Sequence, residues 1–171
     1  MTLSLELFNV LNFKNNFMNL KVGNKFPDFK LNDDTGETFQ LYKDTNTSFL
    51  VLYFYPKDET PGCTKQACYF KDYYDEFKQL DCEIIGISSD DETSHEKFKT
   101  NYNLPFKLLS DQHSKLRKDI NLPKDFFGLS PGRITFLLNS KSEILFIHRS
   151  SLKMKSHIKE VLEFLNENIL V

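Results

Sequence analysis

Apolar and polar positions follow one another in short blocks along most of the chain, and these blocks predict strands and helices in turn. Residues 49–55 are apolar without interruption, which is typical of a central strand that is buried on both faces. In residues 64–80, apolar side chains recur at steps of three and four, which predicts an amphipathic helix. Residues 158–165 repeat that spacing, so we expect an amphipathic helix near the end of the chain.

The other blocks complete an alternating order of strands and helices. Two apolar stretches, 29–31 and 38–41, flank NDDTGE, whose two Asp and one Gly suit a turn, which predicts an N-terminal hairpin. Thr93 and Glu96 form a capping-box pattern, which predicts a helix start before Phe98. We also expect strands at 84–87 and 106–109, a helix at 114–120, and a hairpin of 134–138 with 144–147. This order favours an α/β fold with a central mixed sheet flanked by helices, as in an elaborated thioredoxin-like sheet.

The composition is that of a globular protein. Of the 171 residues, 40% are hydrophobic and 14% are aromatic, which is enough apolar surface for a folded core. The 22 basic and 24 acidic side chains give a formal net charge of -2, so neither nucleic acid nor a membrane surface is expected as a partner. A membrane span needs about twenty apolar residues, far more than the run at 49–55 provides.

The start of the chain is set apart from this domain. Residues 1–17 contain one acidic and one basic side chain, no Arg, and no small-residue cleavage site, so they make a poor signal peptide. Met18 offers another translation start. We therefore expect a cytoplasmic protein with an extension at 1–19 and a domain at 20–171. An organelle leader and a mis-assigned start are the alternatives for the extension.

The cysteines are the candidates for chemistry. Cys63, Cys68 and Cys82 form an odd set, so a reducing compartment fits better than a secreted disulfide scaffold. Cys63 follows a strand and a loop with two prolines and one glycine, and stands at or beside the start of the expected helix. Free amides and the positive end of the helix dipole stabilise a thiolate, the reactive form of cysteine. Position alone leaves a reactive thiol and an inert buried thiol equally open.

A longer pattern surrounds Cys63. The spacing Pro56-x-x-x-Thr60-x-x-Cys63 is that of a peroxiredoxin active site, and the string FYPKDETPGCTKQAC resembles the peroxiredoxin Q subgroup, also called bacterioferritin comigratory proteins. Further matches are KVGNKFPDFKL at 21–31, IIGISSDDETSHEKF at 84–98, LPFKLLSD at 104–111 and GRITFLLN at 132–139. The resemblance covers residues 20–166. It departs from the subgroup at Tyr69, where a small residue is usual, and between Ile120 and Arg133, where the chain is shorter.

This resemblance implies a thioredoxin-like fold and a thiol-dependent peroxidase. Cys63 would be the peroxidatic nucleophile, and Cys68 would resolve its sulfenic acid as an intramolecular disulfide. Thr60 would hold peroxide and thiolate through its hydroxyl, Pro56 would shield the pocket, and Arg133 would supply guanidinium donors.

The resemblance also implies the partners. They are hydrogen peroxide or organic hydroperoxides as substrates and thioredoxin or a similar dithiol protein as reductant, with a monomeric chain and no metal, haem or flavin. Cys82 has no motif around it, so we expect a buried structural thiol. Only Cys63 and Cys68 are closely spaced, which disfavours a four-ligand zinc site. The alternative function is a non-catalytic thioredoxin-fold binding or chaperone module.

The spacing of Cys63 and Cys68 does not allow an intact helix and a disulfide between them at the same time. Cα atoms five residues apart on an ideal helix lie about 8.6 Å apart. A disulfide needs roughly 4.4–6.8 Å between its Cα atoms. We therefore expect the first turns of this helix to unwind when the two thiols join.

Overall fold

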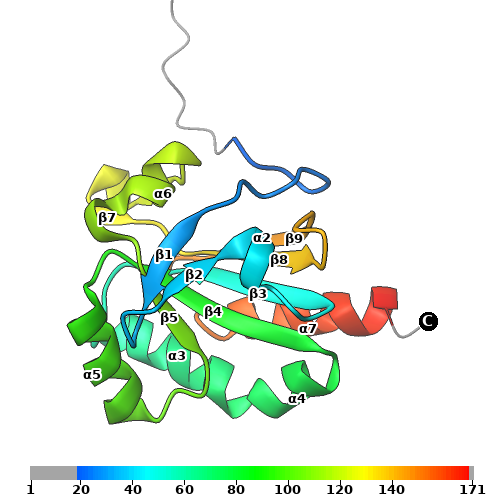
Figure 1. Ribbon diagram of the computed structural model, residues 1–171, viewed down its shortest axis with the longest axis horizontal. Coiled ribbons are helices and arrows are strands. Elements are labelled where there is room, and N and C mark those ends of the chain that lie inside the picture. Colours follow the sequence, from blue (N-terminus) through cyan, green and yellow to red (C-terminus); the bar gives the residue numbers. More distant parts are fainter. Residues whose placement is uncertain (1–18, 170–171) are drawn as a thin grey trace, which may run out of the picture.

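A β-sheet runs through the middle of the protein with helices on either side (Figure 1). The structure is a computed structural model and describes residues 19–169. The strands are β1 (Lys30–Asp33), β2 (Thr38–Gln40), β3 (Phe49–Phe54), β4 (Cys82–Ser88), β5 (Lys107–Ser110), β6 (Lys124–Asp125), β7 (Ser130–Pro131), β8 (Ile134–Asn139) and β9 (Ile144–Arg149). The helices are α2 (Leu41–Asp44), α3 (Pro61–Asp72), α4 (Tyr74–Gln79), α5 (Glu92–Tyr102), α6 (Lys115–Asp119) and α7 (Ser156–Ile169), with 3₁₀ turns η1 (Gln112–Ser114) and η2 (Phe126–Gly128).

The main sheet is mixed, as the order of elements predicted. Within residues 19–169 it has seven strands in the order β2-β1-β5-β4-β3-β8-β9. β3 runs parallel to β4, and β4 runs parallel to β5, whereas the other neighbours are antiparallel. β3 lies between β4 and β8, which confirms the central position predicted for the apolar run.

The predicted N-terminal hairpin is present as β1 and β2, which pair antiparallel with Leu31 opposite Phe39. Asp33 holds the turn, because its Oδ1 accepts hydrogen bonds from the backbone N–H groups of Thr35 (2.9 Å) and Glu37 (3.1 Å). The same strand continues the sheet by pairing with β5. The hairpin therefore forms one edge of the main sheet.

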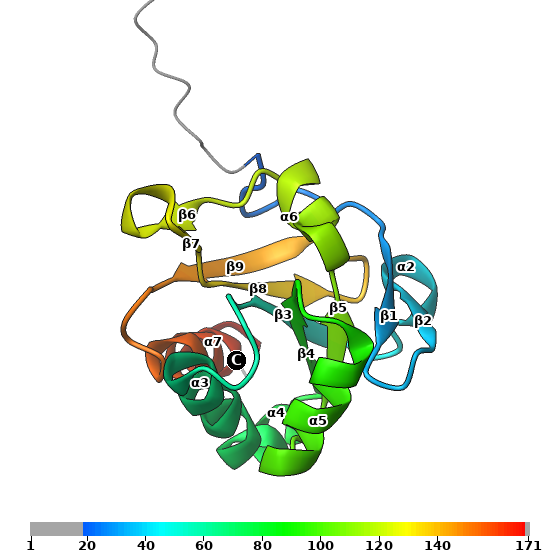
Figure 2. The same cartoon turned by 90° about the vertical axis from the view of Figure 1, so that its left-hand side faces the viewer.

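The two faces of the sheet are covered by different elements (Figures 1 and 2). On β3, Val51 and Tyr53 belong to the cluster that also contains Phe70 of α3 and Ile158 of α7. Leu52 and its alternate neighbours face the opposite cluster, which includes apolar residues of α2 and α6. Period-two alternation explains this division, because successive side chains of a strand point to opposite faces. The helix that carries Cys63 thus packs on the same face as α7.

Two details differ from the predictions. The helix expected at 64–80 is divided into α3 and α4 at Tyr73, whose φ of -106° and ψ of 11° are not helical. The apolar stripe continues across the break, with the rings of Phe70 and Phe77 6.1 Å apart, so the spacing of side chains gave no sign of it. The capping box is wrong, because α5 begins at Glu92 and its cap is Asp91, which accepts a hydrogen bond from the N–H of Ser94 (2.8 Å).

No helix formed by residues 19–169 combines the length and the apolar character that crossing a bilayer requires. The expected extension at 1–19 lies almost wholly outside the described residues. The domain expected at 20–171 therefore stays a prediction at both of its ends.

Candidate active site

The chain between β3 and α3 brings a thiol to the carboxyl end of the central strand. Thr60 occupies the N-cap with an extended backbone (φ -76°, ψ 148°), and its carbonyl accepts the first helical hydrogen bond, from the N–H of Thr64 (2.9 Å). Pro61 follows at the first helical position, where its fixed φ suits a helix and no N–H is needed. Cys63 consequently lies in the first turn of α3.

Cys63 is almost completely buried, with 1% of its surface exposed. It packs in the cluster that α3 and α7 share with the sheet, and it is a free thiol. The N–H groups of a first helical turn have no partners within the helix, and together with the dipole they favour negative charge. The position suits a thiolate that reacts with a small molecule.

Arg133 lies beside the first turn of α3, from a point 70 residues further along the chain. It is 8% exposed, and its Nη1 donates a hydrogen bond to Oε1 of Gln66 (3.0 Å). A Cβ atom placed on Gly62 would lie 2.8 Å from Nη2 of Arg133, so only glycine allows this approach without a shift. The structure therefore brings a guanidinium to the residue that precedes Cys63.

Two further side chains hold the segment that carries Arg133. Asp125 accepts a hydrogen bond from the backbone N–H of Arg133 through Oδ2 (3.3 Å). Arg117 donates to the carbonyl oxygens of Gly132 (2.9 Å) and Tyr55 (3.4 Å), which links the start of β8 to the end of β3. Burial lowers the pKa of Arg117 to about 10, which leaves its guanidinium charged at neutral pH. Sequence reasoning assigned no role to either residue.

The segment that departs from the peroxiredoxin Q pattern, between Ile120 and Arg133, forms the small sheet of β6 and β7. It contributes to the site through Asp125, the last residue of β6, which accepts the hydrogen bond from the backbone N–H of Arg133. No sequence signal marks this sheet, because each of its strands has only two residues and neither alternates.

Thr60 and Pro56 stand at the two ends of the loop before α3. The hydroxyl of Thr60 donates to the carbonyl oxygen of Lys57 (3.0 Å), which leaves its oxygen free to accept a hydrogen bond. Pro56 lies directly after Tyr55 and is half-buried. Thr60 is thus the N-cap of α3, Pro56 lies close to the end of β3, and the roles expected for both stay predictions.

Cys68 lies on the same helix as Cys63, five residues further on, and is partly exposed. Both thiols are free, in accordance with the incompatibility between an intact helix and a disulfide at this spacing. Cys82 begins β4 and is buried, as expected. Burial raises the pKa of Cys82 well above that of an ordinary thiol, which makes it a poor nucleophile.

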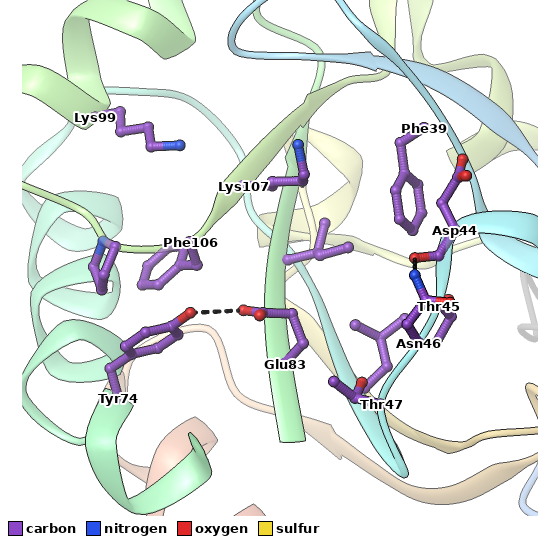
Figure 3. A pocket seen from close by; sticks show the side chains of 13 residues that line it. Phe39, Asp44, Thr45, Asn46, Thr47, Tyr74, Glu83, Lys99, Phe106 and Lys107 are labelled. Carbon is purple, nitrogen blue, oxygen red and sulfur yellow. Dashed lines mark hydrogen bonds between the residues drawn. The ribbon is translucent and has the colours of Figure 1, made fainter. Parts of the chain in front are cut away.

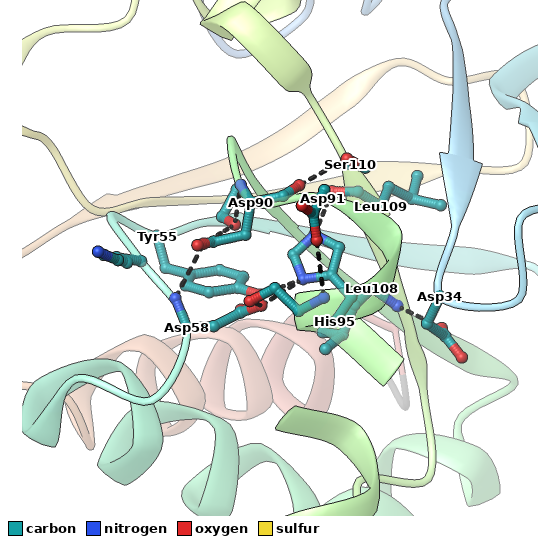
Figure 4. Close-up of polar contacts among 12 residues, drawn as sticks. Asp34, Tyr55, Asp58, Asp90, Asp91, His95, Leu108, Leu109 and Ser110 are labelled. Atoms are coloured by element: carbon teal, nitrogen blue, oxygen red, sulfur yellow. Dashed lines mark hydrogen bonds and ion pairs between the residues drawn. The ribbon is translucent and has the colours of Figure 1, made fainter. Parts of the chain in front are cut away.

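A buried polar network fixes the loop from the other side (Figure 4). Asp58, 5% exposed, accepts hydrogen bonds from the hydroxyls of Tyr55 (2.7 Å) and Ser94 (2.8 Å). His95 of α5 places Nδ1 2.8 Å from Oδ2 of Asp58 and Nε2 3.1 Å from the carbonyl oxygen of Leu109. Sequence reasoning missed this pair, although both residues stand inside the matched strings FYPKDET and SHEKF.

Unpartnered polar atoms gather at α3. Within residues 19–169, the buried side-chain polar atoms without a hydrogen-bond partner are Tyr53 Oη, Thr64 Oγ1 and Gln66 Nε2. Thr64 and Gln66 belong to α3, and the ring of Tyr53 stacks 4.6 Å from that of Phe70 on the same helix. Burial also raises the pKa of Tyr53. Each such group costs about 1–3 kcal/mol, so the packed position of α3 is less stable than its apolar contacts suggest.

A pocket of about 460 Å³ lies at the opposite end of the sheet (Figure 3). Its lining includes Leu50, Glu83 and Lys107, which stand at or near the amino ends of β3, β4 and β5. Its charged groups already have polar partners within the protein: Tyr74 donates to Glu83 (3.0 Å), Gln40 N–H donates to Asp44 (2.7 Å), and Lys107 and Lys99 bind Asp33 and Asp34. The pocket contains no thiol, so the candidate chemistry lies with Cys63.

Comparison with known proteins agrees with this geometry. The AhpC/TSA family matches residues 22–147. The chain is 46% identical over 149 residues to "Peroxiredoxin Q, chloroplastic" of Arabidopsis thaliana (87% of this chain, 68% of that protein). It is 45% identical over 149 residues to the protein of that name from Populus jackii (87% and 70%).

Solved structures agree as well. Peroxidoxin BcpB from Mycobacterium tuberculosis matches with a TM-score of 0.80 at 30% identity and covers 87% of this chain and 98% of its own. Peroxiredoxin Q from Xanthomonas campestris matches with a TM-score of 0.76 at 29% identity (88% and 98%).

These matches, together with the thiol at the start of α3, show that the chain belongs to the AhpC/TSA family and has its thioredoxin-like fold. Within that family its relatives are proteins of the peroxiredoxin Q subgroup, as the motif around Cys63 predicted. The chain is a thioredoxin-dependent peroxidase, an oxidoreductase.

Proposed function

We propose that the chain reduces hydrogen peroxide and organic hydroperoxides with Cys63 as the peroxidatic thiol. The observation that supports this most is the buried thiol in the first turn of α3. It directly follows Gly62, which the guanidinium of Arg133 approaches closely. The thiolate attacks one peroxide oxygen, the O–O bond breaks, and the other oxygen leaves with the electron pair and takes a proton as water or alcohol. Cys63 becomes a sulfenic acid.

Arg133, Thr60 and Pro56 serve this step in different ways. The guanidinium of Arg133 donates hydrogen bonds to the oxygen on which negative charge develops. Because the hydroxyl of Thr60 donates to Lys57, its oxygen accepts the hydrogen bond of the peroxide O–H and orients the O–O bond. Pro56 limits the access of water to the pocket.

Cys68 resolves the sulfenic acid in the second step. Its thiolate attacks the sulfur of Cys63, a disulfide forms, and the hydroxyl leaves as water. Because both residues lie on α3, the first turns of the helix must unwind before the sulfurs meet. The three unpartnered polar atoms at α3 lower the cost of this opening, because an opened helix exposes them to water.

A dithiol protein of the thioredoxin kind then returns the disulfide to two thiols, and the chain acts as a monomer. The relatives from Arabidopsis thaliana and Populus jackii are chloroplastic proteins, which favours an organelle over the cytoplasm as the site of action. A fluorescent protein fused behind residues 1–19 and expressed in the source cell distinguishes the two compartments.

The test of the proposal is a set of single cysteine variants. Cys63→Ser should lose peroxide consumption with dithiothreitol as reductant. In the absence of any reductant, Cys68→Ser should consume one equivalent of peroxide and stop at a sulfenic acid that a dimedone probe captures in the mass spectrum. Cys82→Ser is the matched control and should keep full turnover, because its thiol is buried and has a raised pKa.

Two outcomes would contradict these assignments. If Cys63→Ser still consumes peroxide, the chain has another nucleophile. If Cys82→Ser stops turnover with thioredoxin as the reductant while Cys68→Ser does not, Cys82 is the resolving thiol. Complete inactivity of the unaltered protein towards every peroxide would favour the alternative of a thioredoxin-fold binding or chaperone module.

A further inference from the structure

A groove of about 410 Å³ runs beside the helix that carries both motif cysteines. It lies between α3, the segment that follows β9, and the first turns of α7. We call it the lysine groove, after the residues that characterise it: Lys65, Tyr69, Leu152, Lys153, Lys155 and Lys159. Glu160 and Glu163 also line it, so the groove carries a net excess of positive charge.

The lysines of this groove are not neutralised. Among the residues that the structure describes, none of the four forms an ion pair. Elsewhere Lys99 and Lys107 pair with Asp34 and Asp33. A concentrated positive patch on a chain of formal net charge -2 creates a local field that attracts an anionic surface.

The groove also offers apolar contact. Leu152 is 77% exposed at its rim. The ring of Tyr69 lies beneath the ammonium group of Lys155, at 5.7 Å. An exposed apolar side chain within a charged rim is typical of surfaces that bind another protein.

The position of the groove connects it with the redox step. Lys65 lies one turn before Cys68 on α3, and Tyr69 directly follows Cys68. At the other end, a Cβ atom on Gly62 would lie 3.3 Å from Cε of Met154, so the segment after β9 reaches the first turn of α3. A protein bound in the groove therefore stands over the part of α3 that opens.

We propose that the lysine groove is the docking surface of the reductant, a dithiol protein with acidic side chains around its reactive thiol. This inference rests on the proposed function. One thiolate of the bound dithiol attacks the sulfur of Cys68, the 63–68 disulfide breaks, and Cys63 leaves as a thiolate that takes up a proton. The second thiolate of the dithiol attacks the mixed disulfide and releases Cys68. The two electrons come from the dithiol, which becomes a disulfide.

The experiment measures turnover with two kinds of reductant. Lys153→Glu/Lys155→Glu reverses the charge of the groove, and Lys30→Glu/Lys141→Glu is the matched control at exposed lysines outside it. One thioredoxin with acidic residues around its active site and one with basic residues there serve as protein reductants. Dithiothreitol, which needs no docking surface, reports the intrinsic chemistry.

We expect kcat/KM for the acidic thioredoxin to fall about tenfold in the groove variant and to stay unchanged in the control variant. The basic thioredoxin should serve the groove variant better than the unaltered protein. Salt should slow the acidic thioredoxin with the unaltered protein and leave the groove variant almost unaffected. Turnover with dithiothreitol should be equal in all three proteins. Leu152→Ser tests the apolar contact independently and should raise KM for thioredoxin with kcat retained.

Several results would overturn the inference. Unchanged kinetics with both thioredoxins would show that the groove is not used. An equal fall with dithiothreitol and thioredoxin would assign the lysines to the chemistry of Cys63. A change of oligomeric state in the groove variant would assign the surface to a second copy of the chain. If the unaltered protein fails to turn over with dithiothreitol, the proposed function itself fails, which the other results do not imply.

Discussion

Arg133 is held by two separate parts of the chain: α3 contacts its guanidinium, and β6 contacts its backbone. Gln66 accepts a hydrogen bond from Nη1, Gly62 leaves room for Nη2, and Asp125 fixes the backbone N–H. A planar fork can face two partners at once, whereas a lysine ammonium is a single point of charge on a flexible stem. A lysine at position 133 therefore cannot replace the arginine without loss of one of these contacts.

We predict that Arg133→Lys slows the oxidation of Cys63 by about 100-fold, because the ammonium cannot reach Gln66 and the developing charge together. Stopped-flow measurement of peroxide consumption in a single turnover checks this. Lys141→Arg is the control, since it makes the reverse exchange at an exposed residue. An unchanged rate in Arg133→Lys would remove Arg133 from the chemical step.

Residues close to Cys63 in sequence were easier to predict than those that reach the site through the fold. Thr60 and Pro56 share a local motif with Cys63, and Arg133 was found only because it stands in a matched string. Asp125 and Arg117 act through backbone groups on other segments, so their residue types carry no signal. A hydrogen bond from a side chain to a distant backbone group depends on where the fold places the two groups, so the sequence alone does not reveal it.

At the scale of elements, α7 is fixed to the sheet by a buried histidine. Nε2 of His157 lies 2.8 Å from the carbonyl oxygen of Ser150 and so carries the proton, while Nδ1 accepts from the hydroxyl of Thr135 (2.8 Å). Burial lowers the pKa of His157 to about 4. The ring of His148 lies 4.8 Å away, and a second cation there is unfavourable. The neutral ring is thus part of the folded structure.

This arrangement predicts an acid-sensitive fold. An unfolded histidine binds a proton near its ordinary pKa of 6.5, whereas folded His157 stays neutral down to about 4. The unfolded state therefore gains protons first, and stability is lost as the pH falls from 6.5 towards 4. The loss from this group amounts to about 3 kcal/mol. Urea unfolding of the reduced protein at several pH values measures it.

The control for this prediction is a pair of histidine variants. His157→Asn should have a smaller free energy of unfolding at pH 7 and a flatter dependence on pH below 6.5. His113→Gln changes an exposed histidine and should follow the unaltered protein. Parallel pH curves for all three proteins would show that His157 does not titrate differently in the folded state.

Strong apolar periodicity predicted elements well, and weak periodicity did not. β3 and α7 have continuous patterns and lie where the sequence predicted them. The break at Tyr73 preserves the stripe of α3 and α4, so it left no mark on the pattern. β6 and β7 pair through only two residues each, which is too short for alternation to be recognised.

At the scale of the whole molecule, a rigid sheet carries a helix that is poised to open. β3 is hydrogen-bonded along its length to β4 on one side and β8 on the other, and its side chains are buried on both faces. Of the three unpartnered buried polar atoms found within residues 19–169, two belong to the first turns of α3, and the third is on Tyr53, whose ring stacks on Phe70 of the same helix. Local opening of α3 therefore leaves the central strands intact.

We predict that oxidation changes hydrogen exchange in α3 and not in the sheet. After one equivalent of peroxide, amides of residues 64–72 should lose most of their protection, because a 63–68 disulfide cannot coexist with the helical spacing of those residues. Amides of residues 51–54 should keep theirs, since their partners on β4 and β8 do not move. Hydrogen exchange with mass spectrometry on reduced and oxidised protein compares the two segments.

Cys68→Ser separates opening that the disulfide causes from opening that peroxide itself causes. This variant forms the sulfenic acid at Cys63 but no bond across α3, so residues 64–72 should stay protected after peroxide. Equal protection in both forms of the unaltered protein, with the 63–68 disulfide established by peptide mapping, would mean that the bond forms without unwinding. In that case the prediction that a 63–68 disulfide cannot form within an intact α3 is wrong.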